Sequence, residues 1–218
     1  MRGVLSLSFD DGNKTDLTIG YQGMIDRNIK PRGTTFLIPS FVAPTRLTLQ
    51  ERIDLINGGW DMECHTYNHA YAPDLTELTP NEIREELKLV NEYFIDILGI
   101  PSPTVIAYPG GATNDYVKGI IKPFRKMARG TQEGFITRNP DMLELQSFSF
   151  ITNTLDKLKW VIDMVNTYGL YADIRMHELE TTEDIEKYGL LLDYIKQTNT
   201  RLVDMRELYQ LLNKNESV

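Results

Sequence analysis

Residues 4–12 read Val-Leu-Ser-Leu-Ser-Phe-Asp-Asp-Gly, in which apolar and small polar residues alternate until a turn sequence stops them. Alternation with a period of two, followed by Asp-Asp-Gly, is typical of a strand that ends in a turn. From Thr15 to Asn28 the apolar residues follow helical spacing instead, which predicts a helix directly after the strand. A strand followed by a helix is the repeating unit of a parallel sheet.

The same alternation of strand and helix patterns continues through the chain. Thr79-Pro80-Asn81-Glu82, for example, combines a capping residue, a proline in the first turn and a glutamate three residues on, which predicts a helix start. Further strands are expected at residues 34–38, 60–64, 104–108, 126–129, 147–151, 172–176 and 202–203. Further helices are expected at 48–57, 80–98, 114–124, 153–167, 181–198 and 205–212, with an irregular loop at 131–147. This order predicts an α/β fold of parallel strands with helical crossovers, in an open sheet or a barrel.

The bulk properties fit one acidic globular domain. The 218 residues suffice for one buried core, so residues 1–218 are expected to form a single domain. The net charge of −8 gives no general field that would attract nucleic acid. The apolar stretch at the N-terminus is too short and too alternating for a signal peptide, and no apolar run reaches about 18 residues. We therefore expect a cytoplasmic protein without a membrane span. The single cysteine, Cys64, is expected to be a core residue.

All three histidines of the chain follow expected strands. His65 and His69 are four residues apart, which would let them face the same way on a helical turn and share one metal ion, although most such pairs bind nothing. Asp10 and Asp11 are adjacent carboxylates that repel each other unless a cation compensates, although Asp-Asp-Gly is also ordinary turn chemistry. Because the carboxyl ends of parallel strands share one face, these residues can converge with His177.

The two motifs together predict more than either does alone. One carboxylate and two imidazoles make three protein ligands and leave a coordination position open, as hydrolytic zinc sites require. The second carboxylate is then available as a base, and His177 as the acid that protonates a leaving amine. Pro109-Gly110-Gly111 exposes backbone N–H groups that suit an oxyanion. The set predicts metal-dependent hydrolysis.

Four segments, in this order, resemble the motifs of the polysaccharide deacetylases, carbohydrate esterase family 4. They are Ser8-Phe9-Asp10-Asp11-Gly12, His65-Thr66-Tyr67-Asn68-His69, Tyr108-Pro109-Gly110-Gly111 and Met176-His177. The resemblance covers about residues 3 to 212, nearly the whole chain. It implies a distorted barrel of about seven parallel strands with helices outside.

The resemblance also implies roles for the matching residues and a ligand set. Asp10 matches the general base, His177 the general acid, and Gly110 the residue whose backbone N–H helps to hold the oxyanion. The metal ligands would be Asp11, His65 and His69. Zinc suits this set, although cobalt, nickel and manganese also fit it. The implied substrate is an N-acetylated sugar or oligosaccharide, and nothing in the sequence indicates the oligomeric state.

One departure from the family pattern concerns the base. Many members have an arginine that pairs with it where this chain has Ala107. Arg129, at the expected end of the next strand, is the candidate to take over, because a guanidinium can hold a carboxylate through two parallel hydrogen bonds. The alternative is a surface arginine that continues a basic segment from Lys122.

Two further departures concern the acid histidine. Arg175-Met176-His177 stands where Leu-x-His is usual. The motif that supplies an aspartate and a tryptophan has no clear match. Asp156 and Trp160 come nearest, but their place in an expected amphipathic helix favours ordinary surface and core positions.

Three functions therefore remain open. The leading hypothesis is a metal-dependent hydrolase that removes N-acetyl or similar acyl groups from an amino sugar or glycan. A second is hydrolysis of a non-sugar amide or cyclic imide by the same residues. The third is a degenerate carbohydrate-binding protein, which the loss of the motif arginine at Ala107 favours. Retention of a base and an acid beside the ligand set favours an enzyme, because a binding module needs neither.

Overall fold

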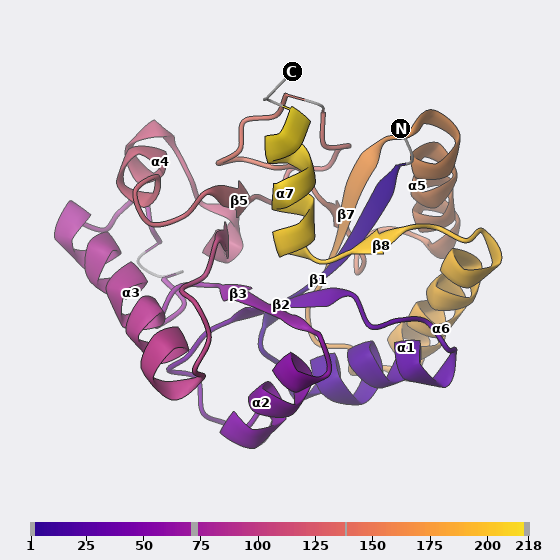
Figure 1. Cartoon of the computed structure of the whole chain (residues 1–218), viewed down its shortest axis with the longest axis horizontal. Helices are drawn as coiled ribbons and strands as arrows, with labels where there is room; N and C mark the ends of the chain where they lie inside the picture. Colours follow the sequence, from indigo (N-terminus) through magenta and orange to yellow (C-terminus); the bar gives the residue numbers. More distant parts are fainter. Residues whose placement is uncertain (1–2, 71–73, 138, 216–218) are drawn as a thin grey trace.

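Eight parallel strands form one curled sheet around the centre of the molecule (Figure 1). The computed structural model describes residues 3–70, 74–137 and 139–215. Seven strands follow the order β5-β4-β3-β2-β1-β7-β6, and β8 pairs with β1 off this path. The strands are β1 (Val4–Asp11), β2 (Gly33–Leu37), β3 (Asp61–Cys64), β4 (Val105–Ala107), β5 (Met127–Arg129), β6 (Phe148–Ser149), β7 (Tyr171–Met176) and β8 (Leu202–Val203). The predicted distorted barrel of about seven parallel strands is confirmed.

Helices cover the outside of this sheet (Figure 1). They are α1 (Gln22–Asp26), α2 (Leu49–Asn57), α3 (Pro80–Glu92), α4 (Asp115–Ile121), α5 (Leu155–Tyr168), α6 (Thr182–Gln197) and α7 (Met205–Asn215). The expected cap of α3 is present, since Thr79 and Glu82 form a reciprocal capping box. The helices expected at 15–28 and 80–98 include π-helical segments, Asp16–Tyr21 and Tyr93–Ile97, which hydrophobic spacing does not distinguish from α-helix.

An irregular segment completes the barrel beside β5. The Ala128 N–H donates to the Met142 carbonyl at 2.8 Å, and the Gly130 N–H donates to the Leu145 carbonyl at 2.9 Å. The same segment then runs into β6, which pairs with β7. Residues 142–149 therefore bridge the two sides of the sheet, although their sequence carries no strand pattern before residue 147.

The helix α7 covers the end of the barrel where the strands begin. Its Met205, Leu208 and Leu212 are buried in one cluster with Val4 of β1 and Val105 of β4. The carboxyl ends of the strands, which carry the candidate residues, lie at the opposite end. The apolar face of α7 thus closes one end of the barrel, whereas the candidate residues lie at the other end.

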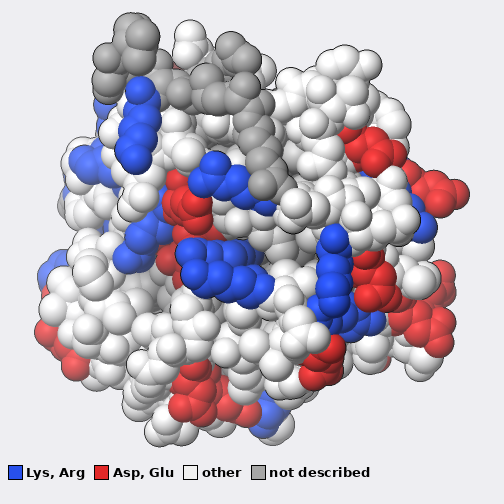
Figure 2. All heavy atoms as spheres, turned by 45° about the vertical axis from the view of Figure 1, so that its right-hand side comes forward, with Lys and Arg blue, Asp and Glu red and all other residues white. Residues whose placement is uncertain are grey.

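The surface mixes charges of both signs. In the face seen in Figure 2, basic and acidic side chains lie near one another and form no extended patch of one sign. The basic segment from Lys122 is not one solvated face, because Arg125 and Arg129 are 0% and 1% exposed. Cys64 is buried, as expected. Among the described helices, none is both long and apolar enough to cross a membrane.

Candidate active site

The Asp10–Asp11 pair lies at the carboxyl end of β1. In an extended strand, neighbouring side chains point to opposite faces. Here Asp11 has a φ of 76° and Gly12 a φ of 72°, in the left-handed region that aspartate and glycine tolerate better than most residues. Asn13 fixes the turn by donating from Nδ2 to the Asp10 carbonyl at 2.9 Å. As a result, both carboxylates line the same cavity.

The loop His65–His69 follows β3 and carries the paired histidines. The predicted helical turn is wrong, because the chain here is irregular and both Thr66 and His69 have positive φ values, 61° and 55°. The two imidazole rings are nevertheless brought together, with their centroids 5.0 Å apart. His65 directly follows β3, and the left-handed residues Thr66 and His69 reverse the chain direction after it. The two histidines are therefore brought side by side by this loop and not by a helical turn.

Glu86 of α3 holds this loop from outside the cavity. Its carboxylate accepts hydrogen bonds from the Tyr67 N–H at 2.7 Å and from the Asn68 N–H at 2.8 Å. A third bond, at 2.7 Å, comes from Asn68 Nδ2. Hydrogen bonds to a charged acceptor are stronger than neutral ones, so Glu86 fixes the loop that positions His69.

Asp11, His65 and His69 meet the geometric requirement of a metal site. Nε2 of His65 and Nε2 of His69 lie 3.4 Å and 3.7 Å from Asp11 Oδ1. One ligand atom from each residue lies within 4.8 Å of the others, and two atoms bound at about 2.1 Å to a tetrahedral ion are about 3.4 Å apart. Asp11 Oδ1 is also buried and accepts no hydrogen bond from any described residue. The residues present therefore fit a divalent metal ion.

The protonation states favour the same use of these residues. Burial tends to raise the pKa of Asp11, but the His65 and His69 imidazoles lower it to about 2. Burial, together with His65, lowers the pKa of His69. His65 Nδ1 lies 2.8 Å from the Ala107 carbonyl, and because a carbonyl only accepts, Nδ1 carries the proton and Nε2 is left to face Asp11. Ionised carboxylates and neutral imidazoles are the forms that bind metals.

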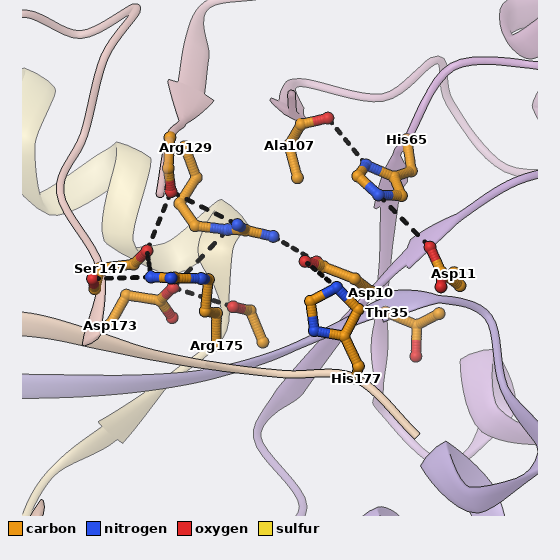
Figure 3. Close-up of polar contacts among 12 residues, drawn as sticks. Asp10, Asp11, Thr35, His65, Ala107, Arg129, Ser147, Asp173, Arg175 and His177 are labelled. Atoms are coloured by element: carbon orange, nitrogen blue, oxygen red, sulfur yellow. Dashed lines mark hydrogen bonds and ion pairs between the residues drawn. The ribbon is translucent and has the colours of Figure 1, made fainter. Parts of the chain in front are cut away.

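Asp10 lies between Arg129 and His177 (Figure 3). Nη2 of Arg129, at the end of β5, contacts Asp10 Oδ1, and His177 Nε2 lies 3.8 Å from Asp10 Oδ2. The predicted contact of Arg129 with Asp10 is confirmed, and the alternative of a surface arginine is wrong. Burial tends to raise the pKa of Asp10, but Arg129 and the nearby histidines bring it below the ordinary value. The Asp10 carboxylate is thus ionised, oriented and partly shielded from water.

The two other expected site residues are His177, which is largely exposed, and Gly110, whose backbone N–H has no acceptor in the described part of the chain. The His177 side chain is 56% exposed, so its imidazole is accessible to solvent and to a ligand. Gly110 and Gly111 follow β4 with φ values of 62° and 77°. The Gly110 N–H has no acceptor among the described residues, whereas the Gly111 N–H donates to the Tyr108 carbonyl at 2.9 Å. Gly110 therefore lines the cavity and has a backbone N–H without an acceptor among the described residues.

The candidate residues line one open cavity of about 630 Å³ at the carboxyl ends of the strands. Its lining includes Asp10, Asp11, His65, His69, Tyr108, Gly110, Arg175 and His177. Ile151, Thr152, Glu178 and Glu180 contribute further lining from the segments after β6 and β7. The cavity joins a candidate ligand set, a carboxylate, an imidazole and a free N–H in one place.

Two polar positions on β7, the buried Asp173 and the half-buried Arg175, were not recognised from the sequence as candidate site residues. Asp173 accepts hydrogen bonds from Ser6 and Ser8 of β1 at 2.8 Å each, and its Oδ2 lies 3.8 Å from Arg129 Nε. Arg175 follows two residues later on the same face. The signal was the period-two series Asp173, Arg175, His177, which places Asp173 and Arg175 on the strand face that points into the barrel and His177 directly after the strand.

Asp156 and Trp160 take no part in the cavity. Both lie on α5, where Asp156 is exposed and Trp160 is 42% exposed. The Trp160 ring packs 5.7 Å from that of Phe135. The structure thus supports surface roles for them, and neither replaces the family's usual aspartate or tryptophan.

Comparisons with known proteins agree with this geometry. The model of the polysaccharide deacetylase family matches residues 2–125, more than half of the chain. The chain therefore belongs to the polysaccharide deacetylase family. A comparison with curated proteins found no match.

Solved structures show the same fold. The Streptococcus pyogenes deacetylase PplD, in complex with acetate, is 26% identical with a TM-score of 0.59, over 65% of this chain and 62% of that one. The Xyl-CE4 domain of a xylanase from the hindgut metagenome of Trinervitermes trinervoides is 17% identical with a TM-score of 0.67, over 96% and 91%. BA3943 of Bacillus anthracis, described as a CE4 family pseudoenzyme, is 18% identical with a TM-score of 0.68, over 95% and 66%. These structures thus include one protein described as a deacetylase and one described as a pseudoenzyme.

Proposed function

We propose that the protein is a metal-dependent hydrolase that removes N-acetyl or similar acyl groups from an amino sugar or glycan. The observation that carries the proposal is the pairing of a metal-type ligand set with an ionised, oriented Asp10 carboxylate in one cavity. Membership of the polysaccharide deacetylase family supports a deacetylase hydrolase.

Each residue has a step in this mechanism. A divalent ion, most suitably zinc, held by Asp11, His65 and His69 would polarise the carbonyl and make water more acidic. Asp10 takes a proton from the attacking water, while the Gly110 N–H donates to the carbonyl oxygen as it becomes negative. His177 then donates a proton to the nitrogen as the C–N bond breaks. The products are a free amine and a carboxylate.

The alternative of a degenerate carbohydrate-binding protein is supported by the similarity to BA3943, which is described as a pseudoenzyme. Against it stands the Asp10–Arg129 pair. A buried carboxylate costs free energy to maintain, and binding a sugar does not need one beside an exposed imidazole. The second alternative, hydrolysis of a non-sugar amide or cyclic imide, uses the same residues and differs only in the substrate.

The first test is activity with and without metal. The protein is stripped with a chelator, reloaded separately with zinc, cobalt, nickel or manganese, and assayed for free amine from N-acetylated oligosaccharides. We expect activity to vanish on stripping and return on loading. Full activity of the stripped protein would contradict metal dependence. Turnover of simple amides or imides, but not of sugars, would favour the second alternative, and binding without turnover the degenerate protein.

The acid and base are tested separately from the metal. Asp10→Asn is expected to lower kcat by about 10²–10⁴ while metal affinity, measured by calorimetry, stays near the wild-type value. His177→Ala is expected to have a similar effect. If Asp10→Asn lost the metal and Asp11→Asn kept it, the roles of the two aspartates would be exchanged.

A further inference from the structure

Arg175 lies inside the candidate active site and pairs with no carboxylate of the described part of the chain. It is half-buried on β7, two residues after Asp173 on the same face of the strand and two residues before His177, which follows the strand. It also lines the cavity. Among the described residues, no carboxylate oxygen lies within 4.0 Å of its guanidinium, whereas Arg129 beside it contacts Asp10 and lies near Asp173. One of the two neighbouring cations is thus neutralised and the other is not.

The guanidinium of Arg175 is held in a fixed orientation by neutral groups. Its Nη1 donates to the Ser147 carbonyl at 2.9 Å and to Ser147 Oγ at 3.0 Å (Figure 3). Ser147 is itself fixed, because its Oγ donates to the Gly130 carbonyl at 2.9 Å. Nε and Nη2 donate to no described residue, so two donors of a planar fork remain for a ligand.

The charges around the Arg175 guanidinium do not fully neutralise it. Burial and the adjacent Arg129 lower the pKa of Arg175, and the more distant Asp10, Asp173 and Glu133 offset this only in part. An arginine stays charged at any physiological pH, and a partly buried charge without a partner costs free energy. An anionic group of a ligand would remove that cost.

We propose that Arg175 is a specificity residue that binds a carboxylate carried by the substrate close to the amide that is cut. This inference rests on the proposed function, since it names the substrate class of the same cavity. The fork of an arginine matches a carboxylate through two parallel hydrogen bonds. A single negative charge suits the cavity better than a phosphate dianion, because Asp10, Asp11, Glu178 and Glu180 also line it.

The carboxylate can come from either side of the amide. It can belong to the acyl group, as in an N-succinyl amino sugar, or to the sugar, as in a lactyl ether of N-acetylglucosamine. The two sources share the same chemistry at Arg175, and matched substrates distinguish them.

The test compares three oligosaccharides of equal length with the metal-loaded protein. One is neutral and N-acetylated, one carries the lactyl carboxylate on the sugar, and one carries an N-succinyl group. We expect kcat/KM for one charged substrate to exceed that of the neutral one by about 10- to 100-fold, the usual worth of a hydrogen bond to a charged group. The favoured substrate identifies the side on which the carboxylate lies.

The variants separate recognition from a structural role. In Arg175→Leu the preference is expected to fall to about one, mainly through KM, and in Arg175→Lys to be only partly retained because a lysine lacks the fork. Arg84→Gln, at an exposed arginine on α3, is the control and should keep the full preference. Thermal unfolding and metal binding of each variant show that it is folded. Equal rates for all three substrates in the wild type would overturn the inference, as would a loss in Arg175→Leu that is the same for every substrate.

A binding measurement distinguishes failure of this inference from failure of the proposed function. Equilibrium binding of the three oligosaccharides to metal-loaded Asp10→Asn, with and without Arg175→Leu, requires no turnover. If no substrate is cleaved yet the charged ligand binds better in an Arg175-dependent way, the hydrolase proposal fails and the inference stands. If the substrates are cleaved without any charge preference in rate or binding, the hydrolase proposal stands and the inference about Arg175 fails.

Discussion

At Arg129 one guanidinium lies between two buried carboxylates. It contacts Asp10 directly, its Nε lies 3.8 Å from Asp173, and its Cζ lies over the Phe36 ring, 5.0 Å from the ring centroid. Ion pair and ring together leave it little freedom, so the Asp10 carboxylate is fixed as well. An arginine from the next strand thus contacts Asp10, although this chain has Ala107 where many family members have the pairing arginine.

This arrangement predicts that Arg129 orients the base without contributing to metal binding. Arg129→Lys keeps the charge but loses the fork, and we expect kcat to fall about 10- to 100-fold because a small displacement of a reacting group is costly. The metal Kd, measured by calorimetry, should not change. In Arg129→Ala the unpaired buried carboxylates should also cost about 3–5 kcal/mol of stability, measured by chemical unfolding. A folded Arg129→Lys protein with wild-type kcat would mean that Arg129 has no part in catalysis.

At the scale of elements, the helix α3 supports a loop that belongs to the active site. Its start is fixed by the Thr79 capping box, and Glu86, two turns further on, receives the backbone N–H groups of Tyr67 and Asn68. The loop needs such support, because Thr66 and His69 have left-handed backbone conformations that cost free energy in non-glycine residues. The geometry of the candidate metal site therefore depends on a helix that contributes no ligand.

Replacing Glu86 should then weaken metal binding from a distance. Glu86→Gln removes the charge that strengthens the hydrogen bonds to the loop, and we expect metal affinity to fall about 10- to 100-fold, as for other residues that orient ligands. Calorimetric titration with zinc measures the change. Glu85→Gln, at the exposed neighbouring position on α3, is the matched control. Equal affinities of the two variants would show that the loop is held by other contacts.

At the scale of the whole molecule, the two ends of the barrel are built differently. The end opposite the active site is closed by α7, whose Arg206 reaches two carboxylates on β3. Arg206 Nη2 lies 3.2 Å from Glu63 Oε1, and its Nε lies 3.6 Å from Asp61 Oδ1. Glu63 also accepts the Val105 N–H at 2.8 Å. Burial outweighs these partners and raises the pKa of Glu63 to about 7.

The raised pKa predicts a pH dependence of stability. Folded Glu63 retains its proton above the ordinary value of 4.5, so its contribution is fully present below 4.5 and is lost as the pH rises through about 7. Because a tenfold change in proton affinity on folding corresponds to about 1.4 kcal/mol, the free energy of unfolding should fall by about 1–3 kcal/mol. Glu63→Gln cannot ionise, so its Tm should fall less than that of the wild type between about pH 4.5 and pH 8. The exposed Glu186→Gln should behave like the wild type, and parallel Tm curves for all three would contradict the assignment.

The sequence predicted most of the fold because its signals are local. Strand alternation, helical spacing and the Thr79 cap depend only on neighbouring residues, and each of these elements is present. The ordered motifs likewise pointed to Asp10, Asp11, His65 and His69 before any geometry was known, and these side chains do line one cavity. Their catalytic and metal-binding roles remain predictions. The place of Arg129 followed from strand order, since β5 pairs with β4 and so ends at the same face.

The sequence alone determined the α/β class, the parallel strands and the candidate residues at their carboxyl ends. Only the tertiary structure decided that His65 and His69 meet through a left-handed loop rather than a helical turn, and that residues 142–149 complete the barrel. It also decided that Asp173 and Arg175 face the interior, one paired and the other without a carboxylate partner among the described residues. The physical reason is that pairing and burial arise between residues far apart in the chain, whereas sequence patterns report only near neighbours.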